Sequence, residues 1–73
     1  MEYLQQVMHM RCKIEELVKQ SGLRKDYIAN ELGISTRQLR NYELNRSYPP
    51  IDKAYLLADL LGVRVDELYE KED

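Results

Sequence analysis

The amino-acid sequence predicts an all-α domain made of five short helices. Apolar residues recur at intervals of three and four along almost the whole chain, and no alternating strand pattern lasts beyond a few residues. Glycines at 22, 33 and 62 and a turn over residues 45–50 divide the chain into five pieces. A length of 73 residues indicates one domain, residues 1–73, whose core is worth only about 3–5 kcal/mol.

The first predicted helix covers about residues 2–20, and its early part is an N-terminal extension of the helix. Its apolar face is a stripe at helical spacing, formed by Tyr3, Val7, Met10, Ile14 and Leu17. Gly22 is expected to end the helix in the left-handed conformation.

The second and third predicted helices cover residues 25–32 and 36–44. Gly33 lies between them and is expected to have a positive φ, which a residue without a Cβ adopts at little cost. Ser35 is a favourable N-cap for the third helix because its hydroxyl accepts from backbone amides that lack a helical partner.

The fourth and fifth predicted helices cover residues 51–61 and 65–69, and an acidic, frayed tail is expected over residues 70–73. The predicted core takes apolar residues from all five helices and the turn. Its members are Ile14, Leu17, Val18, Ile28, Ala29, Leu32, Ile34, Leu39, Tyr42, Ile51, Ala54, Tyr55, Leu57, Ala58, Leu61, Leu68 and Tyr69.

Composition restricts the function to small binding modules. The 11 basic and 13 acidic residues argue against a polycation that coats nucleic acid, although a local basic face is enough to bind DNA. One Cys and one His exclude a metal site of such ligands, and neither an enzyme nor a cofactor is expected. Cys12, expected to be a small buried group, indicates a reducing, cytoplasmic compartment. No signal peptide or stretch of about 18 apolar residues indicates contact with a membrane.

Residues 25–44 have the pattern of a DNA-binding helix-turn-helix. Ala29 is small where two helices must approach closely, and Gly33 forms the turn. Polar side chains that suit base edges project from the second helix of this motif: Thr36, Arg37, Gln38, Arg40 and Asn41. Arginine can fork onto guanine, Asn and Gln can pair with adenine, and Thr can meet a thymine methyl group. These five residues are therefore predicted to read bases.

The stretch GLRKDYIANELGIS, residues 22–35, resembles the start of the helix-turn-helix in the Cro/phage-repressor family, also called Xre-type regulators. The match continues through residues that fall in register: Leu39, Tyr42, Glu43, Pro49, Ala54, the segment 61–63 and the segment 66–69. The resemblance covers roughly residues 11–70. It implies a five-helix, phage-repressor-like fold and sequence-specific binding of double-stranded DNA. It also implies a transcriptional regulator, such as a repressor of phage or prophage origin, that acts as a homodimer on a palindromic operator.

The resemblance also implies roles for single residues. Thr36, Arg37 and Asn41 fall where the family reads bases, and Gln38 and Arg40 flank them. Three further residues fall where the family contacts phosphates: Lys25, Arg46 and Tyr48, the last of which could instead pack under the Pro-Pro turn.

Three positions depart from the family pattern. Arg24 replaces the usual N-cap of the second helix. Val18 replaces an arginine that pairs with Glu43, so this glutamate is expected to pair with Arg46 or Arg40 or to stay solvated. Asn45 replaces the glycine after the recognition helix and tolerates the left-handed conformation moderately well.

The charge distribution favours DNA binding by the helix-turn-helix. Residues 22–48 hold five basic and three acidic groups, whereas residues 49–73 hold three basic and seven acidic groups. The acidic end is therefore expected to face away from DNA. The alternative is a protein-interaction module on the same fold, an antirepressor or adaptor that binds a regulatory protein, and the net charge of -2 keeps it open.

Two apolar clusters are left over after the predicted core is filled. They are Leu4, Val7, Met8 and Met10 on the helix extension, and Leu56 and Leu60 on the fourth helix. Either the two clusters pack together within one chain, or one or both form a two-fold dimer contact. The resemblance suggests the corner at residues 63–65 as another dimer contact.

Overall fold

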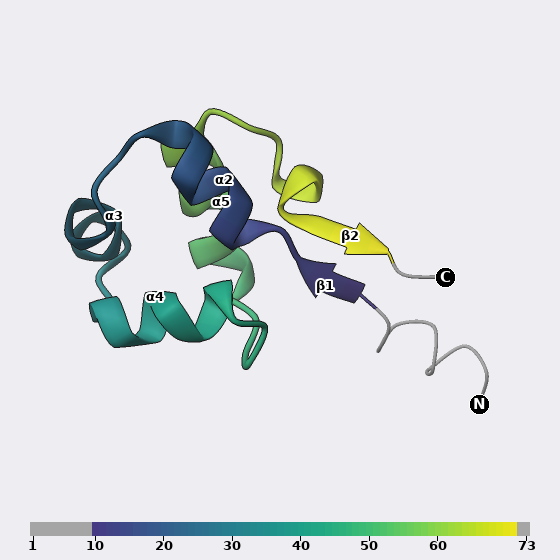
Figure 1. Ribbon diagram of the computed structural model, residues 1–73, viewed down its shortest axis with the longest axis horizontal. Helices are drawn as coiled ribbons and strands as arrows, with labels where there is room; N and C mark the ends of the chain where they lie inside the picture. Colours follow the sequence, from purple (N-terminus) through teal and green to yellow (C-terminus); the bar gives the residue numbers. More distant parts are fainter. Residues whose placement is uncertain (1–9, 72–73) are drawn as a thin grey trace.

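The computed structural model describes residues 10–71 and shows a mostly helical fold that contains a helix-turn-helix (Figure 1). Its elements in chain order are β1 (Met10–Cys12), α2 (Ile14–Ser21), α3 (Lys25–Leu32), α4 (Thr36–Glu43), α5 (Ile51–Leu61), the 3-10 helix η1 (Val65–Leu68) and β2 (Tyr69–Lys71). Within this range there are four α-helices, so the prediction of five is wrong. The predicted fifth helix is a single 3-10 turn, and its last residue, Tyr69, begins a strand.

A two-stranded antiparallel sheet replaces part of the predicted first helix. Arg11 pairs with Glu70, and Cys12 pairs with Tyr69. Backbone bonds to a partner almost sixty positions away thus override the local helical spacing, and α2 begins only at Ile14. The predicted frayed tail is also wrong at residues 70–71, which belong to β2. The part of the predicted extension at residues 1–9, with Leu4, Val7 and Met8 of its apolar cluster, lies outside the described residues, whereas Met10 belongs to β1.

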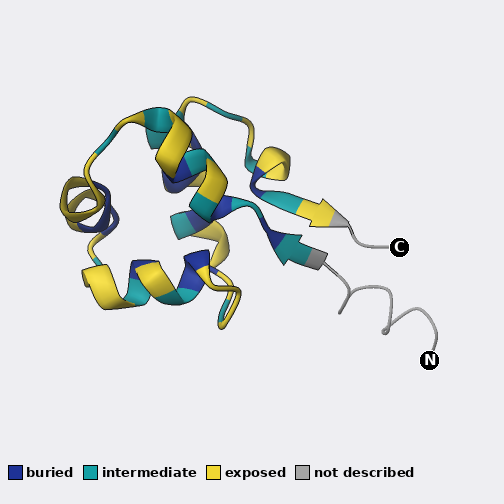
Figure 2. Ribbon diagram, viewed as in Figure 1, coloured by how far each residue is buried: buried dark blue, intermediate teal, exposed yellow. Residues whose placement is uncertain are grey.

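The helices and the sheet share one apolar core, which Figure 2 shows as the inward faces of the ribbon. Its buried apolar residues are Cys12, Ile14, Val18, Ile28, Ala29, Leu32, Leu39, Tyr42, Ala54, Leu57, Ala58 and Leu68. The prediction fails for Ile51 and Tyr55, which are 78% and 59% exposed on α5. Leu60 was expected to be exposed, but it is half-buried against the core. Among the described residues, no helix is long and apolar enough to cross a membrane.

The turn between α3 and α4 has the conformation that the sequence predicts. Gly33 has φ = 71°, and its amide bonds the carbonyls of Ala29 and Asn30. The backbone amide of Gln38 donates to the hydroxyl of Ser35, which caps α4 at 3.0 Å. Arg24 makes no side-chain cap for α3, as its position in the sequence indicates. The turn therefore depends on the glycine and on the serine cap.

We expect Gly33→Val to destabilise the fold by about 1–3 kcal/mol, because a β-branched residue is strained at positive φ. Space is not the reason, since a Cβ at this position would meet only Lys53 Nζ, at 3.6 Å. Urea unfolding measures the loss. Gly33→Asn is the matched control and should lose less, because asparagine tolerates the left-handed region. Equal stability of the parent and the valine variant would contradict the assigned strain.

Candidate nucleic-acid interface

Helix α4 carries the predicted base-reading residues, and its buried side determines which of them face outward. Leu39, Tyr42 and Glu43 are buried. At about 100° per residue, the opposite side of the helix is centred on Arg37 and Asn41. Arg37 is exposed and Asn41 is half-buried. Figure 2 shows the exposed and intermediate positions of α4 on the side away from the other helices.

Two of the predicted base-reading residues, at the start of α4, make no side-chain hydrogen bond or ion pair within the described part of the chain. Thr36 and Arg37 are exposed, and their side chains make no hydrogen bond or ion pair with residues 10–71. Their side chains can therefore turn toward a ligand without breaking a contact within this range.

Gln38 and Asn41 are joined to each other and to the loop after α4. The Asn41 amide nitrogen donates to Gln38 Oε1 at 3.2 Å, and Gln38 Nε2 donates to Ser47 Oγ at 3.3 Å. No sequence motif gives Ser47 a role. Its only signal is a hydroxyl in a polar loop close to α4 in sequence.

Arg40 points toward neighbouring carboxylates. Its Nη1 lies 3.2 Å from Glu43 Oε1 and 3.1 Å from Glu15 Oε2 on α2. The hydrogen bonds to Glu43 and then to Glu15 raise the pKa of the Arg40 guanidinium above its ordinary value, so it remains a cation. These contacts hold the guanidinium, which is predicted to read bases, between α4 and α2.

Glu43 is the centre of this ion-pair network. Its side chain is 0% exposed, and its Oε1 is also 3.3 Å from Lys25 Nζ on α3. Of the three outcomes expected for Glu43, pairing with Arg40 is the one found, and Lys25 is a partner that the sequence did not indicate. Two cations together take the place of the arginine that is absent at Val18. The network therefore connects α4 to both α2 and α3.

The predicted phosphate ligands lie on different elements. Lys25 is the first residue of α3 and forms an ion pair with Glu43. Arg46 and Tyr48 are exposed in the loop between α4 and α5. The Tyr48 ring lies 6.4 Å from the Tyr69 ring, so this tyrosine packs against β2 while remaining half in solvent.

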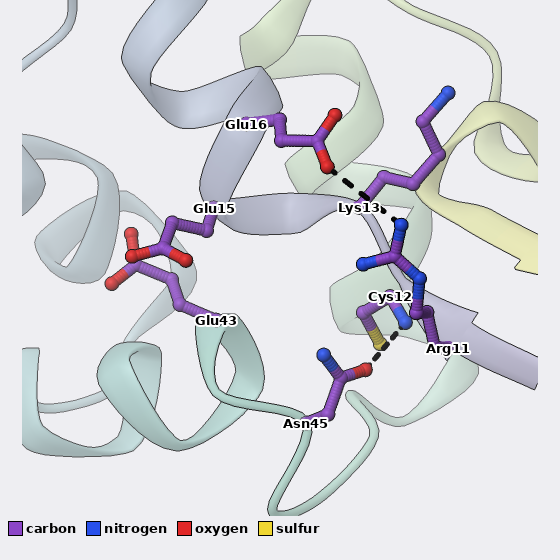
Figure 3. A pocket seen from close by; sticks show the side chains of 7 residues that line it. All are labelled: Arg11, Cys12, Lys13, Glu15, Glu16, Glu43 and Asn45. Carbon is purple, nitrogen blue, oxygen red and sulfur yellow. Dashed lines mark hydrogen bonds and ion pairs between the residues drawn. The ribbon is translucent and has the colours of Figure 1, made fainter.

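The loop after α4 is connected to the sheet through Asn45. This residue has φ = 63°, as its sequence position indicates, and its Oδ1 accepts from the backbone amide of Cys12 at 2.5 Å (Figure 3). Burial raises the pKa of the Cys12 thiol, which favours the neutral form. The loop that carries the exposed Arg46 is therefore anchored to β1.

A small pocket of about 50 Å³ lies beside this junction. Figure 3 shows the Glu15 and Glu43 side chains on one side of it and Asn45 with Cys12 on another. Glu43 Oε2 is buried and has no hydrogen-bond partner in the described part of the chain. No group of metal-ligating side chains occurs among residues 10–71.

The fold and the exposed face of α4 define a helix-turn-helix domain, and comparison with known proteins agrees. The helix-turn-helix family matches residues 14–68, so the chain belongs to this family, of the Xre/Cro-like type. The crystal structure of a candidate DNA-binding protein from Bacteroides fragilis superimposes with a TM-score of 0.78 at 23% identity. The match covers 84% of this chain and 98% of that one, and it shows the shared fold. No curated protein matches the sequence.

Proposed function

We propose that this protein binds double-stranded DNA in a sequence-specific manner and regulates transcription, as a cytoplasmic repressor of phage type. One observation carries the proposal. Helix α4 buries Leu39 and Tyr42 and directs Arg37 and Asn41 to the opposite side, where a major groove can receive them.

The chemistry of this outward face suits base edges. Arg37 can donate two hydrogen bonds to O6 and N7 of a guanine, and Asn41 can donate to N7 and accept from N6 of an adenine. Their spacing of four positions places both on one side of α4, so both can enter the same groove. Thr36, at the first turn of α4, supplies a methyl group that suits thymine.

Selection of bound sequences from a random duplex library tests this function. We expect an enriched motif with two-fold symmetry and half-sites about one DNA turn apart. Equal binding of all duplexes, or no binding, would contradict the proposal and favour a protein-interaction module on the same fold. The full chain is used, and its folded state is checked by circular dichroism.

We expect Arg46→Gln to weaken binding to the selected site and to random duplexes alike. Arg46 is exposed beside α4, and a phosphate contact carries no sequence information. The slope of log affinity against log salt should fall by about one. Lys19→Gln, an exposed cation in the last turn of α2, is the control. A changed base preference with an unchanged slope would contradict the phosphate role of Arg46.

The proposal includes a homodimer, for which the exposed side of α5 offers apolar side chains on either side of the exposed Asp52 and Asp59. Ile51 and Tyr55 are exposed there, and Leu56 is 39% exposed. With Leu60 half-buried, these three residues replace the predicted pair of leucines as the candidate contact. A second copy on this face would hold two α4 helices for two half-sites about 34 Å apart.

We expect sedimentation at micromolar concentration to show a dimer for the parent and a monomer for Tyr55→Glu/Leu56→Glu. A buried carboxylate without a partner is costly, so the added charges should separate the copies. Gln20→Glu adds charge at an exposed position of α2 and should remain dimeric. A parent that is monomeric both free and on DNA would remove the dimer. A dimer that survives both glutamates would shift the contact to the corner at residues 63–65.

A further inference from the structure

We propose that Gln38 is a positioning residue: it sets the orientation of the Asn41 carboxamide, uses Ser47 as its anchor, and does not itself read a base. This inference rests on the proposed function, because it concerns how α4 recognises one base pair. It revises the role that the sequence pattern assigns to Gln38.

The contacts form a chain from the loop to the outward face of α4. Ser47 Oγ accepts from Gln38 Nε2 at 3.3 Å, and Gln38 Oε1 accepts from Asn41 Nδ2 at 3.2 Å. Residues three apart on a helix are neighbours on its surface, so the bond between Gln38 and Asn41 needs no distortion. All three side chains are half-buried, which limits the alternative positions open to them.

Ser47, the anchor of Gln38, lies in a loop that the tertiary structure holds in place. The Arg46 amide donates to the Asn41 carbonyl at 2.9 Å, which turns the chain sharply after α4. The preceding Asn45 accepts from the backbone of Cys12 in β1. Ser47 is therefore presented to Gln38 by a loop that is bonded on both its helix side and its sheet side.

The side-chain amides of Gln38 and Asn41 differ in which donors and acceptors are free. Bidentate readout of adenine requires both the oxygen and the nitrogen of one carboxamide. The oxygen and the nitrogen of Gln38 each already make one hydrogen bond, so only its second N–H and second lone pair are free, and turning its carboxamide toward a base would strain the bonds to Ser47 and Asn41. Asn41 uses only one N–H, and its oxygen and second N–H remain available, which is the pair that adenine takes.

The bond to Gln38 also couples the orientation of the Asn41 amide to that of the Gln38 amide. In the observed orientation an N–H meets the Gln38 carbonyl oxygen. A flip of Asn41 alone would place two carbonyl oxygens against each other, whereas a joint flip of both amides would keep the hydrogen bonds because the Ser47 hydroxyl can also donate. The orientation of Asn41 is therefore coupled to that of Gln38 before DNA arrives, and this pre-organisation lowers the cost of binding.

The test compares base preferences, position by position, among variants of the full chain. Selection with Asn41→Ala first identifies the base pair that Asn41 reads. Gln38→Leu should weaken preference at that same base pair by about tenfold and leave the other positions unchanged. Ser47→Ala should act at the same base pair with a smaller effect. Gln20→Leu, the same substitution at an exposed position of α2, is the control and should change nothing.

Gln38→Glu supplies the conservative rescue. A carboxylate still accepts from Asn41 Nδ2, and the Ser47 hydroxyl can donate to its other oxygen. We expect this variant to keep the preference at the Asn41 base pair, while its added negative charge lowers affinity for all duplexes alike. The double variant Gln38→Leu/Asn41→Ala should show the same base preferences as Asn41→Ala alone, because Gln38 acts only through Asn41.

The outcomes separate this inference from the proposed function. If Gln38→Leu loses base preference at a different base pair, Gln38 reads a base itself. An unchanged preference in Gln38→Leu, with the parent selective, would overturn only the positioning role. A parent without any preference would overturn the proposed function as well. If Gln38→Leu fails to fold, the prediction stands or falls on Ser47→Ala and Gln38→Glu.

Discussion

Replacement of both Arg37 and Asn41 by alanine should abolish most of the selective binding. Each good bidentate contact to a base is worth about 1–3 kcal/mol, so the two losses together amount to about 2–6 kcal/mol on the selected site. Titration of a labelled duplex measures this loss for the single and double variants. Affinity for random duplexes should fall much less, and mainly through Arg37, because only this residue is charged.

The fold should be almost unaffected by these two changes. Both side chains lie opposite the buried side of α4, so Arg37→Ala should change stability by less than about 0.5 kcal/mol, and Asn41→Ala only by the bond that it loses to Gln38, about 1 kcal/mol. A matching loss of thermal stability would mean that the binding defect reflects unfolding. Full affinity and unchanged base preference in the double variant would remove α4 as the recognition helix.

Leu39→Ala should produce the largest loss of stability. Leu39 is 0% exposed on the inner side of α4, and deletion of a buried leucine typically costs about 2–5 kcal/mol. A core of this size supplies only about 3–5 kcal/mol, so a large fraction of the variant should be unfolded without denaturant. Urea unfolding followed by circular dichroism measures the change.

The same substitution at Leu44 provides the control. Leu44 is 37% exposed just after α4, so its replacement by alanine should cost much less. Cognate DNA should partly restore the fold of Leu39→Ala, because a ligand that binds only the folded state shifts the equilibrium toward it. An unaltered unfolding midpoint in Leu39→Ala would contradict the assigned core.

Local patterns in the sequence determine the helix-turn-helix. The bounds of α3 and α5, the positive φ of Gly33 and Asn45 and the Ser35 cap all agree with the prediction. These features depend on side-chain spacing and on backbone preferences within a few residues. The same spacing identifies Arg37 and Asn41, because they follow from which side of one helix is apolar. The resemblance to the Xre-type family starts in this segment, extends over roughly residues 11–70, and is confirmed.

Only the tertiary structure decides the features that join distant parts of the chain. Residues 10–12 have a helical apolar spacing, yet they form a strand because Tyr69–Lys71 offers backbone partners. Ile51 and Tyr55 continue a helical stripe, but the core beneath α5 is filled by smaller and more central residues, so both remain exposed. Periodicity in one segment contains no information about what packs against it.

The polar network around α4 follows the same rule. Lys25 becomes a partner of Glu43, and Ser47 an anchor for Gln38, only when α3 and the loop are brought beside α4. Composition and spacing specify which side chains can donate and accept. Which donor meets which acceptor depends on distances of about 3 Å between separate elements, and those distances are set when the whole chain packs.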